Sequence, residues 1–243
     1  MITADKLDMA LLCNSNDPIF VGGFPVYPVP IRQIRRMGYN RYKMNLAILC
    51  LTEEDISRMM EGIHGAGAPF FFLLSVLAYK ENERQDIIDA FRMVCREDIT
   101  WDMSALEIRT SSGVLREDNF RMFQDAVRQR NQYEVDTADE NPADEFTRQL
   151  MQRSRELDAK RAKARGEDGG VTLADLVSIC AAKLQVHPDV IGTYDMYQLH
   201  DMLGRFKIFD DYEINIQALL HGAKKEDIDI SHWISGNKSL FHD

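Results

Sequence analysis

The stretch "DPIFVGGFPVYPVPIRQIRRMGY", residues 17–39, opens the first ordered region of the chain. Two short apolar runs flank Gly22-Gly23, a pair that can supply the positive φ angles of a tight hairpin. The prolines after this pair cannot donate to a β-ladder, so we expect a small sheet at an edge. Pro30 suits the first turn of a helix, and Gly38 suits its end. The stretch therefore predicts a small β-hairpin that leads into a helix.

Helical patterns continue from this stretch as far as Tyr133. The segment "LTEEDISRMMEG" places Thr52 as an N-cap and Asp55 at the third helical position, as in a capping box. Apolar spacing predicts further helices over residues 39–51, 70–80, 82–96 and 117–129. A second small hairpin is expected around Ser112-Gly113. We assign residues 1–133 to one α-rich domain with small hairpins.

Residues 134–170 differ in composition from the rest of the chain. Residues 134–145 contain six acids and no base, whereas residues 148–165 contain seven bases and two acids. A segment with so few apolar residues cannot bury enough surface to form a core. We interpret it as a charged helical linker that ends at Gly169-Gly170. The alternative is a docking arm that binds a partner through the apolar stripe Phe146, Leu150 and Leu157.

The last part, residues 171–243, has the pattern of a small helical domain. Thr172 caps its first helix, with Asp175 three residues further on. Apolar spacing predicts two later helices, over residues 193–206 and 210–220. We expect Phe206 and Trp233 to be major parts of one small core.

The resulting fold class is mainly α. An α-rich N-terminal domain with small β-hairpins precedes a charged helical linker and a small C-terminal helical domain. Hydrophobic residues make up 45% of the chain and charged residues 28%, which suits a protein that buries an ordinary core.

The segment "KLQVHPDVIG", residues 183–192, contains the His-Pro-Asp tripeptide of the J-domain co-chaperones. A J-domain places a strongly basic helix before that tripeptide. Here the preceding "LADLVSICAAKLQ" has one acid and one base. We interpret the tripeptide as a turn: Pro188 ends one helix or begins a turn, and Asp189 can cap the segment that follows. We therefore predict no co-chaperone role.

We find no constellation of catalytic, metal-ligating or cofactor-binding residues in the sequence. His221, Asp227, Asp229 and His232 are close together, but no histidine spacing places two ligands on one helical face. No serine lies in a GxSxG elbow. The four cysteines are scattered without a CxxC pair, so we interpret them as reduced core residues. The sequence thus predicts no enzyme activity, no metal and no cofactor.

Charge and hydropathy argue against two classes of partner. A net charge of −10 makes the chain a poor binder of phosphate backbones and of anionic membrane surfaces. The longest apolar run, "APFFFLLSVLAY", is too short to span a bilayer and is interpreted as a buried helix. We expect no nucleic acid and no membrane among the partners.

The chain has twelve methionines, a residue type that adapts to irregular apolar partners. We predict that Met59 and Met122 help to bind a partner. Met60, Met151 and Met202 are further candidates, and core filling is the alternative for each of them.

Four segments of the chain form a pattern of packing residues rather than of chemistry. They are "VYPVPIRQIRRMGYNRYKMNLAIL", "RNQYEVDTADENPADEFTRQLMQRSRELDAKR", "VTLADLVSICAAKL" and "YDMYQLHDMLGRFKIFDDYEINIQALLHGAKKEDIDISHWIS". This pattern resembles that of tail assembly proteins of phages and prophages of Gram-positive bacteria. The resemblance implies a non-catalytic chaperone in the host cytoplasm. Such a chaperone binds the tape measure protein, or another tail protein, and keeps it soluble until tube subunits polymerise round it.

Two other classes stay open. One is a structural virion protein, such as a neck, tail or baseplate component, which would remain in purified particles. The other is an enzyme without a recognisable motif, which would show a pocket of convergent polar groups with perturbed pKa values.

Overall fold

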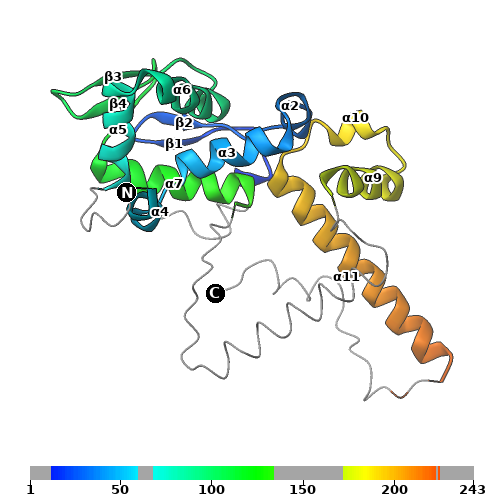
Figure 1. Cartoon of the computed structure of the whole chain (residues 1–243). Helices are drawn as coiled ribbons and strands as arrows, with labels where there is room; N and C mark the ends of the chain where they lie inside the picture. The colour runs from blue at the N-terminus through cyan, green and yellow to red at the C-terminus, as the bar shows by residue number, and fades with distance from the viewer. Residues whose placement is uncertain (1–11, 60–67, 134–171, 223, 225–243) are drawn as a thin grey trace.

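The computed structural model describes residues 12–59, 68–133, 172–222 and 224. Over these residues the chain is mainly α with two small antiparallel sheets, as the sequence predicts. A body of helices and hairpins carries a group of three helices at one end (Figure 1). The longest of these three, α11 (Met196–Leu220), projects away from the body (Figure 1).

The first sheet is the predicted hairpin. Strands β1 (Ile19–Val21) and β2 (Phe24–Val26) pair antiparallel, with Val21 opposite Phe24. Gly22 and Gly23 connect them with φ angles of 58° and 82°. Both values lie in the left-handed region that glycine adopts without strain, so the glycine pair selects this turn.

The second sheet has the order β3-β4-β5. Its strands are β3 (Thr100–Asp102), β4 (Glu107–Arg109) and β5 (Val114–Leu115). The hairpin expected around Ser112-Gly113 joins β4 to β5, whereas the sequence did not predict β3. A Cβ atom on Gly113 would lie 2.0 Å from the backbone carbon of Gly23. The turns of the two hairpins therefore touch, and the contact leaves no space for a side chain at residue 113.

The helices of the body surround these two sheets. They are α2 (Ile31–Met37), α3 (Tyr39–Leu49), α4 (Glu53–Met59), α5 (Pro69–Tyr79), α6 (Glu81–Cys95) and α7 (Glu117–Asn131). The capping box at the start of α4 is confirmed. The Asp55 N–H donates to the Thr52 hydroxyl at 3.2 Å, and the Thr52 N–H donates to the Asp55 carboxylate at 2.9 Å.

Aromatic side chains from three elements meet in the core of the body. The rings of Phe24 on β2 and Phe123 on α7 are 5.5 Å apart edge to face, and Phe91 on α6 stacks on Phe123 at 5.5 Å. Such pairs contribute beyond their buried area. The cysteines are free and buried, as predicted, at residues 13, 50, 95 and 180.

The C-terminal helices are α9 (Leu173–Leu184), α10 (Pro188–Ile191) and α11. The predicted capping box of Thr172 and Asp175 begins α9. The expectation of two helices over residues 193–220 is wrong, because α11 runs unbroken for 25 residues. No glycine or proline interrupts residues 205–220, and Asp210, placed as a helix start, forms an ion pair with Lys183 of α9 instead. Phe206 is partly buried in the small core, and Trp233 lies outside the described residues.

The His-Pro-Asp tripeptide begins the short helix α10. His187 is its N-cap, and the Asp189 N–H donates to the His187 Nδ1 at 3.2 Å. The cap is therefore His187 rather than Asp189. The Asp189 carboxylate faces α2, where it accepts from Arg35 at 3.2 Å.

The C-terminal helices pack directly on the body. The Ile31 N–H donates to the Tyr194 carbonyl and the Arg32 N–H to the Gly192 carbonyl, each at 2.8 Å. Ile31 of α2 is buried in the small core with Cys180, Ala181, Ile191 and Leu199. The first turn of α2 is thus shared by both parts of the chain.

Candidate docking site

An apolar groove of about 410 Å³ lies on the body between α3, α5 and the first turns of α6. Its floor consists of Leu51, Leu73 and Ile87, each less than a tenth exposed. Ile48, Phe72 and Val76 form the walls and are partly buried. A groove of this size and lining accepts apolar side chains from a ligand or partner.

The groove exists because α3 is apolar on two faces. One face carries Tyr42, Leu46 and Leu49 into the core of the body. The other follows helical spacing through Met44, Ala47 and Ile48 to Leu51, and this face lines the groove. Met44 remains 39% exposed. An accessible apolar stripe of this kind is typical of an interaction site.

Helix α5 supplies the opposite wall for a similar reason. Its sequence, "PFFFLLSVLAY", is apolar almost all round, and a helix of that kind needs contacts on every side. Phe70, Leu73, Leu74 and Leu77 point into the core, but Tyr79 is 74% exposed and Phe71 is 39% exposed. The sequence-based interpretation of this run as a buried helix is therefore only half right.

Charged side chains also line the groove. They are Lys80, Glu83 and Asp86. Arg41 of α3 reaches across to α6, where it pairs with Asp86 at 2.8 Å and with Asp89 at 3.1 Å. These pairs are partly exposed, so each is worth little in stability. The lining of the groove is therefore apolar with a smaller charged part.

Of the partner-binding residues predicted from sequence, only Met122 has a described side chain, and it is not among the residues that line this groove. Phe146, Leu150 and Leu157 lie outside the described residues. Met59 is the last residue of α4, and its side chain is likewise outside the description. Met122 is on α7 and is 50% exposed. The signals that would have found the groove were the second apolar stripe of α3 and the excess of apolar residues in α5.

The described cysteines are poor nucleophiles. Burial raises the pKa of the Cys50 and Cys95 thiols to about 12 and raises the pKa of Cys13 and Cys180 as well. These thiols stay protonated near neutral pH. Among the described residues, His, Cys, Asp and Glu side chains also form no group that could hold a metal ion.

A buried arginine joins the N-terminal segment to the C-terminal helices. Arg130, at the end of α7, is fully buried. It donates to the Cys13 and Ser15 carbonyls at 2.9 Å, and also to the carbonyl of Asp17. Three backbone acceptors of one segment are thus satisfied by one guanidinium group.

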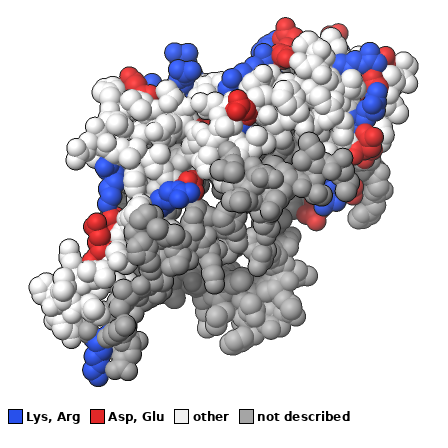
Figure 2. Space-filling view, turned by 180° about the vertical axis from the view of Figure 1, so that it is seen from behind, with Lys and Arg blue, Asp and Glu red and all other residues white. Residues whose placement is uncertain are grey.

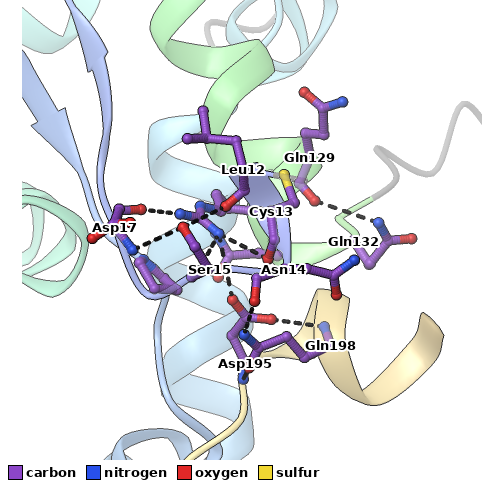
Figure 3. Close-up of polar contacts among 12 residues, drawn as sticks. Leu12, Cys13, Asn14, Ser15, Asp17, Gln129, Gln132, Asp195 and Gln198 are labelled. Carbon is purple, nitrogen blue, oxygen red and sulfur yellow. Dashed lines mark hydrogen bonds and ion pairs between the residues drawn. The ribbon is translucent and has the colours of Figure 1, made fainter. Parts of the chain in front are cut away.

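Asp195, the N-cap of α11, lies beside this guanidinium (Figure 3). The Asp195 carboxylate is 1% exposed and 3.8 Å from Arg130 Nη1, and it accepts from the Gln198 N–H at 2.8 Å. Burial raises the pKa of Asp195 to about 6, and burial also lowers the pKa of Arg130. The Gln198 side chain donates to the Asn14 carbonyl at 3.0 Å. The junction therefore holds residues 13–17, α7 and α11 together.

Residues 160–238 match the family model described as the YomV second domain. The matched family is associated with phages, and the match covers about a third of the chain. It includes α9, α10 and α11. No curated protein and no solved structure matches the chain.

None of the described helices is long and apolar enough to cross a membrane. On the face shown in Figure 2, acidic and basic side chains alternate among larger areas of uncharged residues. Among the described residues on this face, side chains of one charge do not form an extended region.

Proposed function

We propose that the protein is a non-catalytic phage tail assembly chaperone that binds the tape measure protein in the host cytoplasm. The observation that carries the proposal is the apolar groove between α3, α5 and α6. The phage-associated family match of residues 160–238 supports a role in phage morphogenesis. The occupant of the groove would be an amphipathic helix of the tape measure protein.

The chemistry of the groove suits such a helix. A helix that lays its apolar face in a groove inserts side chains at spacings of three and four residues. Each inserted aliphatic side chain contributes roughly 1.5–3 kcal/mol when it leaves water. A basic residue of the helix would meet Glu83, which also lines the groove. Because apolar burial dominates, binding should persist in salt that screens surface charges.

Co-expression with the tape measure protein of the same phage tests the proposal. We expect soluble partner and co-purification through about 0.5 M salt, where the screening length is only a few ångströms. A Val76→Glu substitution on the groove wall should weaken binding at least about tenfold, because it places a charge against apolar surface. Tyr79→Glu is the matched control, since Tyr79 is on the same helix, lies outside the groove lining and is exposed.

Three results would contradict the proposal. A tape measure protein that is equally soluble alone needs no chaperone. If Met122→Glu abolished the complex and Val76→Glu did not, the binding surface would be on α7 instead. Finding the protein in purified virions would favour the structural virion component.

A further inference from the structure

A second, larger cleft lies where the body meets the C-terminal helices. Its volume is about 900 Å³, and its walls are α3 and the end of α7 on one side and α9 and the start of α11 on the other. Leu46 and Met196 form an apolar floor and are almost fully buried. No described residue that lines the cleft is an acid, although the chain has 39 acids and 29 bases.

The α3 wall of this cleft belongs to an acid-free part of the sequence. Residues 31–52 contain five bases and no acid. Two of the five are neutralised, because Arg35 pairs with Asp189 and Arg41 pairs with Asp86 and Asp89. The other three are exposed and have no carboxylate partner within the part of the chain that the structure describes: Arg32, Arg36 and Lys43.

Lys43 is the one of these three that lines the cleft. Tyr39, one turn earlier on α3, is 46% exposed, and His200 of α11 lies on the opposite wall. Burial lowers the pKa of His200, so its imidazole is neutral near pH 7 and can donate or accept one hydrogen bond. The cleft thus offers a cation and two neutral polar side chains above an apolar floor.

We propose that this cleft binds an acidic peptide segment of a partner protein. A carboxylate of the peptide pairs with Lys43, and an apolar side chain beside that carboxylate packs on Leu46 and Met196. Arg32 and Arg36 add long-range attraction that increases the association rate. This site is separate from the apolar groove and does not depend on the function proposed for it.

The charge of the whole molecule argues for a peptide rather than a nucleic acid. Phosphate backbones carry a dense negative charge that a chain of net charge −10 repels. A short peptide presents only a few carboxylates and can reach one lysine locally. The apolar floor also requires an apolar side chain near the charge, which a peptide supplies.

Fluorescence anisotropy with the full chain tests the proposal. The probe is a short labelled peptide in which Asp and Glu flank a Leu-Phe pair. Its counterpart with Asn and Gln in place of the acids should bind about tenfold more weakly. Lys43→Glu should weaken binding of the acidic probe by a similar factor, whereas Lys207→Glu should not. Lys207 is an exposed residue of α11 outside the cleft lining, so the control makes the same change in net charge.

The chain's own acids in residues 134–145 could compete with the probe. The measurement is therefore repeated on a variant in which these six acids are replaced by Asn and Gln. Binding by either protein that Lys43→Glu weakens would support the proposal. Binding by neither, equal loss with Lys207→Glu, or tighter binding of a single-stranded oligothymidylate would overturn it. Circular dichroism melting of each variant excludes loss of the fold as the cause.

Discussion

Arg130 shows how a single buried charge can organise distant segments. Its guanidinium donates to three carbonyls of residues 13–17 and lies beside the carboxylate that caps α11. Nothing in the sequence around Arg130 marks it, because it sits in "VRQRNQY" among residues of similar polarity. Only the packing of α7 against two distant segments makes this arginine different from its neighbours.

We expect Arg130→Met to destabilise the fold by about 3–5 kcal/mol, the usual effect of removing one partner from a buried charged network. Three carbonyls would lose their donor, and Asp195 would lose its nearest cation. Arg121→Met is the matched control, because Arg121 is an exposed residue of the same helix. Urea unfolding measures the free energy of unfolding of both variants. Similar free energies of unfolding for the two variants would mean that the junction contributes little.

The raised pKa of Asp195 predicts a pH dependence with a definite sign. The carboxyl titrates at 3.8 when unperturbed and at about 6 in the fold, chiefly because it is buried. Below about pH 3 the carboxyl is largely neutral in both states, and its contribution to stability is complete. As the pH rises to about 6 or 7, this contribution is lost, because the Asp195 carboxyl then ionises while it is still buried.

Asp195→Asn removes this titration and keeps a residue that caps well. The free energy of unfolding of the wild type, measured relative to this variant, should therefore fall by about 3 kcal/mol between pH 3 and pH 7. Urea unfolding at a series of pH values measures the difference. A difference that stays constant, or one that rises with pH, would show that Arg130 stabilises the ionised carboxylate more than burial destabilises it.

At the scale of elements, local signals predicted most helices and two of the three hairpin turns. Glycine pairs, capping boxes and apolar spacing act within a few residues, and the structure confirms them at Gly22-Gly23, Thr52 and Thr172. The break expected after Phe206 was wrong, because paired acids at residues 210–211 resembled a helix start. An ion pair with Lys183 accounts for Asp210 within a continuous helix, and that contact is not visible in the sequence.

A proline at position 207 distinguishes one helix from two. In a continuous α11, Lys207→Pro removes a backbone hydrogen bond and clashes with the preceding turn, which destabilises the helix by about 3 kcal/mol or more. In a connector between two helices the same proline would have little effect. Lys207→Ala controls for the loss of the lysine side chain. Helical signal and melting temperature by circular dichroism provide the measurement.

At the scale of the whole molecule, sequence patterns predict least about how distant parts of the chain contact one another. Composition marks residues 134–170 as different, but it does not reveal that Ile31 of α2 is buried among α9, α10 and α11. Nor does it reveal the groove, because contacts between α3 and α5 depend on how both helices pack on the core. The candidate Met122 was predicted from its residue type and its place on an expected helical surface, without that information.

The shared first turn of α2 predicts that the C-terminal helices lose stability when the body is altered at Ile31. Ile31→Ala removes buried carbon atoms from the small core, which typically costs about 2–5 kcal/mol. Amide hydrogen exchange should then speed up in α9 and in the first half of α11, although the substitution lies more than a hundred residues earlier in the chain.

Ile34→Ala is the matched control, because Ile34 is on the same helix but belongs to the core of the body. That control should speed exchange in α3 and α6 first. If Ile31→Ala affected only the amides of α2, the C-terminal helices would be stable without the body, and the two parts would fold independently.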